Sequence, residues 1–269
     1  MRNKVVIITG ASSGIGKATA IQFALEGAKI VMAARNKQKL DGAAADNALK
    51  GTAVLTVVAD VAKEQDCKHL IEATIQRFGA IDILINNAGI SMRALFNEAD
   101  LSIIKNVMDI NFWGTVYCTK YALPYLLKSK GSVAGISSIA GYVGLPARTG
   151  YSASKFAMQG FLEALRTENL ENNLHVLIAC PGFTASNIRN MALTADGSSQ
   201  GESPREEEKM MSAEEVASHI FKAIKYRKPN LVLTFEGKMA VMLKKFFPNL
   251  LQRMVFNKMK KEADSPLKS

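Results

Sequence analysis

The sequence predicts an α/β protein in which a doubly wound parallel sheet of about seven strands lies between two layers of helices. Short apolar runs rich in β-branched residues, such as residues 5–8, lack the alternation of a half-exposed strand and are typical of strands buried on both faces. These runs alternate with amphipathic helical patterns, and glycine or polar residues follow several of them. At 269 residues, the chain is long enough for one such domain, which we expect to span residues 1–269.

The first unit of the chain contains a glycine-rich turn between a strand and a helix. Residues 5–8 form the predicted strand, residues 9–16 are TGASSGIG, and a helical pattern continues to Gly27. Glycines let a backbone approach a pyrophosphate closely, and the helix amino terminus offers N–H groups and a positive dipole to it. A plain tight turn is the alternative, but this context favours a Rossmann-type dinucleotide site. The site would be formed by Gly10, Ser12, Ser13, Gly14, Ile15 and Gly16.

The end of the second predicted strand, residues 29–34, indicates which cofactor binds. An acidic residue here would accept hydrogen bonds from the adenosine ribose and favour NAD. Arg35 follows the strand instead, and an arginine pairs with the 2′-phosphate of NADP through charge-assisted hydrogen bonds. A solvated arginine at a helix start is the alternative. We expect NADP(H) to be preferred over NAD(H).

Two further strand ends carry candidate cofactor ligands. Asp60 and Val61 follow residues 54–59, where the carboxylate would accept a hydrogen bond from the adenine amino group or cap the next helix. Residues 86–89, Asn-Asn-Ala-Gly, follow the strand at 81–85 and suit a loop that bonds backbone groups and lets a ligand approach. This loop contributes Asn87, Ala88 and Gly89 to the predicted cofactor site.

Polar side chains also occur in the middle of the chain. Asn111 lies in an apolar part of the long amphipathic segment 100–127, where a buried amide needs a partner. A structural amide bonded to neighbouring backbone is the alternative to a functional one. Ser137 and Ser138 follow the predicted strand 132–136, at the sheet edge where open parallel sheets bind ligands.

The pair Tyr151 and Lys155 carries the candidate chemistry. Both lie at the start of a helical pattern, four residues apart and therefore on one face. A free tyrosine has a pKa of about 10, and a nearby lysine cation favours the phenolate and lowers that pKa. The pair then suits general acid–base catalysis of a hydroxyl–ketone interconversion. An ordinary surface helix is the alternative for the pair taken alone.

The last third of the chain departs from the regular alternation. The predicted strand at 175–179 is followed by Cys-Pro-Gly at 180–182 and by a long polar stretch at 183–211. The position of this stretch after a strand end favours a substrate lid over a disordered loop. A capping-box spacing at Ser212 restarts a helix, and residues 231–235 form the last predicted strand.

The carboxy-terminal extension, residues 238–269, is basic and amphipathic. It contains eight Lys/Arg and two acids, and apolar residues recur at helical spacing on both sides of Pro248, which we expect to kink or break the helix. Some basic amphipathic helices lie in a membrane interface. Packing on the protein's own substrate pocket or on a second subunit is the commoner outcome, and the sequence leaves these alternatives open.

Composition excludes several other classes of protein. The three cysteines and three histidines are scattered, so we expect reduced thiols and no metal site. The apolar run near the amino terminus has only four residues, too few for a signal peptide or membrane span, which predicts a cytoplasmic protein with peripheral membrane contact as an open alternative. The net charge of +10 attracts phosphates, nucleic acid or anionic lipid, but we find no nucleic-acid-binding motif.

Taken together, these motifs resemble those of the short-chain dehydrogenase/reductase (SDR) family over residues 4–235. The matching motifs are the family's TGxxxGIG, NNAG, YxxxK and PG, here at residues 9–16, 86–89, 151–155 and 181–182. Within the family, residues 192–198 and the apolar, basic extension look most similar to the dehydrogenase/reductase member seven group.

The resemblance implies a catalytic tetrad and a mechanism. Ser138 is implied rather than Ser137, because it precedes Tyr151 by the usual thirteen residues. In the family mechanism, NADPH donates a hydride to a carbonyl carbon while Tyr151 protonates the oxygen and Ser138 holds it. Lys155 lowers the tyrosine pKa and bonds the nicotinamide ribose, and Asn111 connects Lys155 to solvent through a water. The family also implies cofactor contacts from Tyr151, Lys155, Pro181, Gly182 and Thr184.

Two hypotheses from other classes of protein compete with that of a ketone reductase or alcohol dehydrogenase. A sensor or scaffold would bind NADP(H) without turnover, but it has no need of Tyr151 and Lys155 together. A membrane-surface protein would act mainly through its extension. For the enzyme, the resemblance implies a homodimer or homotetramer. An apolar (lipid-, steroid- or aromatic-like) substrate is expected from the methionine-rich extension and from Phe183, Met191, Leu193 and Met210.

Overall fold

A parallel sheet forms the centre of the molecule. The computed structural model describes every residue except 183, 185–187, 202–209, 263–264 and 269. Its described residues form one seven-stranded sheet, all parallel, in the order β3-β2-β1-β4-β5-β6-β7. The chain reverses its direction of winding between β1 and β4, so the predicted doubly wound sheet is confirmed. The strands are β1 (Val5–Thr9), β2 (Lys29–Ala34), β3 (Val54–Val58), β4 (Ile83–Asn86), β5 (Ser132–Ile136), β6 (His175–Cys180) and β7 (Asn230–Val232).

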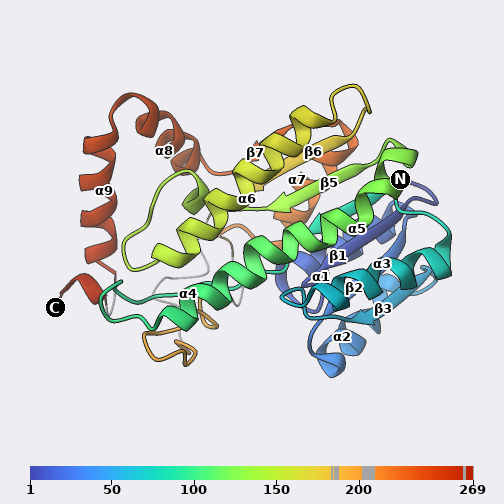
Figure 1. Cartoon of the computed structure of the whole chain (residues 1–269), viewed down its shortest axis with the longest axis horizontal. Helices are drawn as coiled ribbons and strands as arrows, with labels where there is room; N and C mark the ends of the chain where they lie inside the picture. The colour runs from blue at the N-terminus through green and yellow to red at the C-terminus, as the bar shows by residue number, and fades with distance from the viewer. Residues whose placement is uncertain (183, 185–187, 202–209, 263–264, 269) are drawn as a thin grey trace.

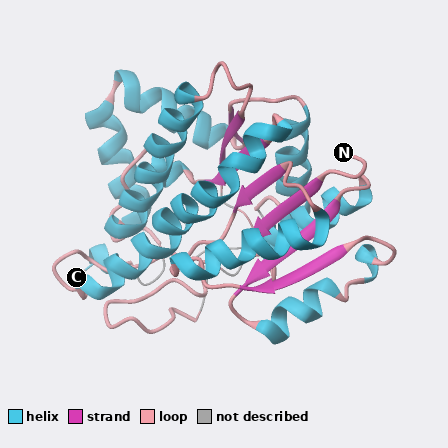
Figure 2. Cartoon of the chain, turned by 45° about the vertical axis from the view of Figure 1, so that its right-hand side comes forward, coloured by secondary structure: helices cyan, strands magenta, loops and turns pink. Residues whose placement is uncertain are grey.

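Helices cover both faces of this sheet (Figure 1 and Figure 2). On one face α1 packs against α7, where the Phe23 and Phe221 rings lie 5.2 Å apart, and on the other lie α3, α5 and α6. The predicted three-layer arrangement is therefore confirmed. The described helices are α1 (Gly14–Leu25), α2 (Lys37–Ala44), α3 (Glu64–Phe78), α4 (Leu101–Met108), α5 (Gly114–Ser129), α6 (Thr149–Glu168), α7 (Ala213–Lys225), α8 (Phe235–Phe246) and α9 (Pro248–Lys260).

The burial of the central strands explains their continuous apolar sequences. Every residue of β1 is buried. Val6 and Ile8 belong to the core on the α1–α7 side, whereas Val5 and Ile7 belong to the core on the other side. Because successive side chains of a strand point to opposite faces, a strand covered on both faces needs apolar residues at every position.

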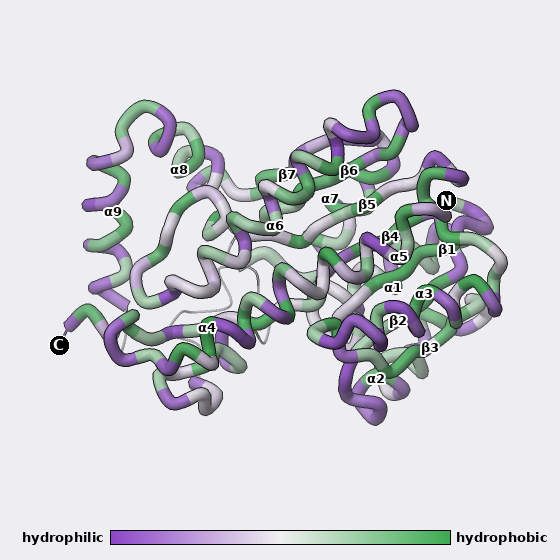
Figure 3. The backbone as a smooth tube through the Cα atoms, viewed as in Figure 1, coloured by the Kyte–Doolittle hydropathy of each residue, from purple (hydrophilic) through white to green (hydrophobic). Residues whose placement is uncertain are grey.

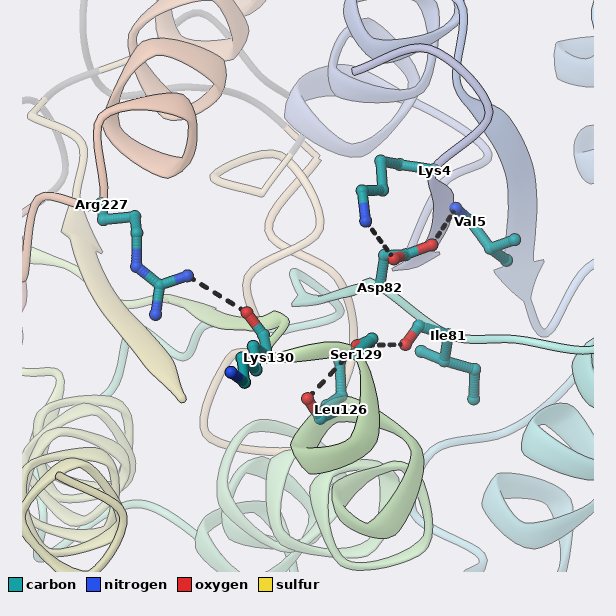
Figure 4. Close-up of polar contacts among 8 residues, drawn as sticks. All are labelled: Lys4, Val5, Ile81, Asp82, Leu126, Ser129, Lys130 and Arg227. Carbon is teal, nitrogen blue, oxygen red and sulfur yellow. Dashed lines mark hydrogen bonds and ion pairs between the residues drawn. The ribbon is translucent and has the colours of Figure 1, made fainter. Parts of the chain in front are cut away.

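At the edge of the sheet opposite the ligand-binding end, polar contacts hold the strands to their neighbours (Figure 4). The Asp82 carboxylate accepts hydrogen bonds from the backbone N–H of Val5 at 2.9 Å and from the Lys4 ammonium at 2.7 Å. The Ser129 hydroxyl donates to the carbonyl oxygen of Ile81 at 2.9 Å. These bonds fix the start of β4 against β1 and against the end of α5.

The predicted amphipathic segment 100–127 is helical with one irregular turn. Residues Asp109–Trp113 form a π-helical turn between α4 and α5. Such turns insert one extra residue into a helix and often occur at functional sites. Here the turn carries Asn111, whose side chain is completely buried.

The last strand differs from the prediction. We expected a strand over residues 231–235, but β7 ends at Val232 and α8 begins at Phe235. The Thr234 hydroxyl accepts a hydrogen bond from the Gly237 N–H at 3.1 Å. This N-cap starts the helix inside an apolar run that by itself favours a strand.

Two predicted helix signals are confirmed. Ser212 caps α7 in a capping box with Glu215. Pro248 stands at the first position of α9, directly after Phe247, so the proline separates two helices. The two helices lie at one end of the molecule, remote from β3 (Figure 1). Within the described residues, none of the helices combines the length and the apolar character that crossing a bilayer needs.

Only part of the predicted lid belongs to the described residues. Residues 183, 185–187 and 202–209 lie outside them. In the described part, Leu193 pairs with Met92, and the Arg93 N–H donates to the Leu193 carbonyl at 2.8 Å. This segment therefore lies against the loop that follows β4.

Candidate functional site

A cavity of about 860 Å³ lies where the carboxyl ends of β1, β4, β5 and β6 meet. The strand order reverses at this edge, and open α/β sheets bind ligands there. Every residue predicted to contact the cofactor lines this cavity, as do Ser138, Tyr151 and Lys155 of the predicted tetrad. Asn111 does not line it. Sequence reasoning therefore identified residues from seven separate segments that the fold places around one cavity.

The glycine-rich turn leaves a cradle that side chains would fill. Gly10 has φ +64°, and a Cβ built on it would lie 2.9 Å from the Ala88 Cα. A Cβ on Gly16 would overlap the carbonyl oxygen of Gly10. Ser13 precedes α1, and its side chain makes no capping hydrogen bond to the first turn. The turn thus fits a pyrophosphate, which needs close backbone approach and N–H groups.

The loop after β4 is bonded to the end of β1. The Thr9 hydroxyl accepts hydrogen bonds from the N–H groups of Asn87 and Ala88, both at 3.0 Å. The Asn87 side chain donates to the Thr9 carbonyl at 2.9 Å. These bonds hold residues 87–89 beside the glycine-rich turn, where they form one wall of the cavity.

Polar residues surround the part of the cavity at the ends of β2 and β3, where the sequence predicts that the adenosine binds. Arg35 is exposed and lines the cavity, and Lys39 from the first turn of α2 lines it too. Sequence reasoning missed Lys39, because Arg35 lies before the helix that carries Lys39 and helical spacing does not relate the two. The Asp60 carboxylate accepts a hydrogen bond from the Ala62 N–H at 3.1 Å. Lys63 is the N-cap of α3, so the alternative that Asp60 caps this helix is wrong.

Tyr151 and Lys155 lie on one face of α6, deep in the cavity. The Lys155 ammonium donates to the carbonyl oxygen of Ile136 at 2.8 Å and lies 5.8 Å from the centre of the Tyr151 ring. Burial lowers the pKa of Lys155 to about 8, because a low-dielectric environment disfavours the ammonium. At neutral pH, Lys155 is a buried cation that loses its proton more easily than an ordinary lysine.

The expected lowering of the Tyr151 pKa by Lys155 is wrong for this structure. Burial raises the pKa of Tyr151, and the opposing effects are a hydrogen bond with Ser138 and the charges of Arg148 and Arg189. Desolvation of the phenolate outweighs them. The result is a phenol that keeps its proton at neutral pH, next to a serine hydroxyl that faces the same cavity.

Asn111 makes the contacts of a structural amide. Its side-chain oxygen accepts a hydrogen bond from the Ile90 N–H at 2.8 Å, and its amide nitrogen donates to the Ile90 carbonyl and to the Ser154 hydroxyl, both at 2.9 Å. A Cβ on Gly89 would lie 3.1 Å from the Asn111 oxygen and 3.5 Å from the Lys155 nitrogen. Asn111 is thus a near neighbour of Lys155, and the proton relay stays a prediction.

Besides Lys39, three further polar residues at or beside the cavity were missed by the sequence analysis. Gln159 donates to the Ser137 hydroxyl at 2.9 Å and so orients the serine beside Ser138. Gln159 lies four residues after Lys155 on the same helix, so the sequence alone could have placed the two side chains on one face. Arg148 and Arg189 are buried and line the cavity. Only the fold brings Arg189 to Tyr151, whereas Arg148 is the N-cap of α6 and lies three residues before Tyr151 in the sequence.

The carboxy-terminal extension forms one wall of the cavity. Apart from Lys258, the residues that it contributes to the cavity are apolar, and several are methionines. Met191, from the described part of the lid, also lines the cavity. Phe183 lies outside the described residues. The extension therefore packs on the protein's own pocket, one of the alternatives that the sequence left open. The wall residues include Met239, Leu243, Leu251, Met254 and Met259. Across the described part of the chain, no group of three His, Cys, Asp or Glu side chains could hold a metal ion.

Comparisons with known proteins agree with this geometry. A family model described as short chain dehydrogenase matches residues 4–196. "Dehydrogenase/reductase SDR family member 7B" of Mus musculus is 37% identical over 98% of this chain and 84% of its own. "11-beta-hydroxysteroid dehydrogenase-like 2" of Arabidopsis thaliana is 42% identical over 69% of this chain and 60% of its own. The crystal structure of a short chain dehydrogenase/reductase from Burkholderia phymatum with NAD has a TM-score of 0.83 and 24% identity, over 93% of this chain and 95% of its own.

Proposed function

The chain belongs to the short-chain dehydrogenase family, and from that premise we propose that it is an NADP(H)-dependent oxidoreductase that interconverts a ketone and a secondary alcohol. The observation that carries the proposal is the meeting of the Tyr151 and Ser138 hydroxyls in one cavity with Lys155 behind them. A carbonyl oxygen placed between the two hydroxyls would accept a hydrogen bond from each.

The roles of these residues follow from their surroundings. Because the pKa of Tyr151 is raised, its phenol holds the proton that a reduced substrate oxygen needs. Ser138 holds the substrate oxygen and stabilises the negative charge that develops on it. Lys155 lines the same cavity, and its proposed role is to bond the nicotinamide ribose, as the resemblance to the family implies. The nicotinamide, when bound, supplies or accepts the hydride.

We propose that Arg35 and Lys39 select NADP(H). Both line the adenosine end of the cavity, and two cations at this place favour a 2′-phosphate over a bare ribose hydroxyl. Asn36, rather than Arg35, caps α2 by accepting a hydrogen bond from the Lys39 N–H at 2.9 Å. Arg35 is therefore not needed to start that helix.

The proposed substrate is apolar. Methionine and leucine side chains of α8 and α9 form the wall of the cavity opposite the sheet, and such side chains adapt to ligands of varied shape. The steroid-dehydrogenase name of the Arabidopsis relative supports a lipid- or steroid-like ketone. A cytoplasmic location and assembly into a homodimer or homotetramer remain parts of this proposal. Sedimentation velocity of the purified protein measures the assembly state.

The proposal is tested by cofactor binding and by one substitution. Titration with NADPH and NADH, followed by nicotinamide fluorescence, should show tighter binding of NADPH. The Tyr151→Phe variant should bind NADPH as the unchanged protein does but lose at least 100-fold in ketone reduction, roughly the share of an acid–base group. A sensor or scaffold would bind NADPH and reduce no ketone in either form. Undiminished turnover in the variant would remove Tyr151 from the mechanism.

A further inference from the structure

The segment that contains α8 and α9, residues 235–260, exposes an unusual number of large apolar side chains. Seven of them are between 44% and 77% exposed. Soluble proteins rarely expose contiguous apolar patches unless something binds there. The seven are Phe235, Met242, Phe246, Phe247, Leu250, Met254 and Phe256.

The same segment is strongly basic. It contains six exposed cations and one acid, Glu236, which pairs with Lys258 at 2.6 Å. Figure 3 shows hydrophobic and hydrophilic residues interleaved along both helices at this end of the molecule. We call this combination the apolar–basic face; its cations are Lys238, Lys244, Lys245, Arg253, Lys258 and Lys260.

The corner between the two helices is the most exposed part of this face. Every residue from 244 to 250 is exposed. Phe246 and Phe247 are 63% and 60% exposed, and Lys245 lies beside them with its nitrogen 5.6 Å from the Phe246 ring centre. Aromatic rings flanked by long cationic side chains suit a bilayer interface, where rings enter the acyl boundary and cations reach the headgroups.

The face borders the mouth of the catalytic cavity. Phe235 and Met254 line the cavity and are also 77% and 50% exposed. Their side chains therefore extend from the cavity to the surface. An apolar substrate dissolved in a bilayer would reach the cavity along these side chains without crossing water.

We propose that the apolar–basic face docks on an anionic phospholipid surface. Charge complementarity favours this occupant, because each cation near an anionic bilayer contributes attraction. A second copy of the chain is disfavoured, since a two-fold contact through this face would bring two sets of six cations together. With 12 and 13 residues, α8 and α9 are suited to lying on a bilayer and are too short to span it. This inference goes beyond carbonyl reduction and does not depend on it.

Co-sedimentation with vesicles tests the docking surface. The protein should bind vesicles of phosphatidylcholine with phosphatidylserine and should not bind vesicles of phosphatidylcholine alone, and added salt should release it. The K245Q/R253Q variant should bind about 30-fold more weakly, from about 1 kcal/mol per cation. The F246S/F247S variant should also lose binding, because it removes the apolar part of the contact.

A matched control uses exposed leucines far from the face. Leu25 and Leu170 are 71% and 69% exposed, and the L25S/L170S variant should bind vesicles as the unchanged protein does. Equal loss in this control, or no binding of the unchanged protein to anionic vesicles, would overturn the proposal. It would also be overturned if F246S/F247S kept vesicle binding and changed the sedimentation coefficient instead, since the face would then join two copies. NADPH binding by every variant, measured in the same samples, separates these outcomes from misfolding and from failure of the proposed function.

Discussion

The Glu262 carboxylate lies 3.9 Å from the Arg148 guanidinium and 3.7 Å from that of Arg93, and all three side chains are at most 10% exposed. Arg148 also lines the catalytic cavity and lowers the pKa of Tyr151 against the effect of burial. The Glu262 carboxylate is thus connected, through one arginine, to Tyr151, the residue that we propose as the proton donor. The same contact fastens α9 over the cavity.

Glu262→Gln should lower the free energy of unfolding by about 3 kcal/mol, because breaking a buried ion pair leaves its partners uncompensated. Denaturant titration measures the loss. The control is Glu236→Gln: Glu236 is also in the carboxy-terminal part, but its pair with Lys258 is exposed, so the change should be at most about 1 kcal/mol. If both variants lost a similar free energy of unfolding, the burial of the Glu262 ion pair would add nothing to stability.

The pH dependence of the two reaction directions should differ in sign. Because the pKa of Tyr151 is raised, the phenol is protonated throughout the neutral range, and kcat/KM for ketone reduction should stay flat until pH approaches about 8, where Lys155 loses its charge. Alcohol oxidation needs the phenolate and should accelerate as pH rises. Initial rates in both directions from pH 6 to 10 measure this. A fall in ketone reduction between about pH 6 and 7, below the pKa of Lys155, would contradict the raised pKa of Tyr151.

Stability should depend on pH through Lys155. Its pKa is lowered from 10.5 to about 8, so between these values the unfolded chain binds a proton that the folded chain does not, and stability rises with pH. At about 1.4 kcal/mol per pKa unit, the rise is at most about 3.5 kcal/mol. Lys155→Met should lack this rise, which denaturant titration at pH 7.5 and 10 measures against the unchanged protein. If the free energy of unfolding rose equally with pH in both proteins, a group other than Lys155 would cause the rise.

Arg35→Ala should weaken NADPH binding by about 2 kcal/mol, or roughly 30-fold, because a charge-assisted hydrogen bond to the 2′-phosphate is lost. Binding of NADH should change little. Lys37→Ala is the matched control: it removes a neighbouring cation that pairs with Asp41 and does not line the cavity. Equal weakening of NADPH and NADH by Arg35→Ala would remove this residue from cofactor selection.

Much of the site was predictable from local patterns. The turn at 9–16, the loop at 86–89 and the pair Tyr151–Lys155 each depend on residues close in sequence, and strand ends that follow buried strands must meet at one edge of a parallel sheet. The contacts of Asn111 could not be predicted, because its bonds to Ile90 and Ser154 join segments distant in the chain.

By itself, the sequence determined the order of strands and helices, the dinucleotide-binding turn and the face of α6 that carries Tyr151 and Lys155, because helix and strand periodicity are local. The tertiary structure decided the protonation of Tyr151, since its burial and the charge of Arg189 come from segments far from it in the sequence. It also decided where the extension lies and where β7 ends. Desolvation and long-range charge depend on which segments pack together, and an amphipathic pattern does not specify its partner.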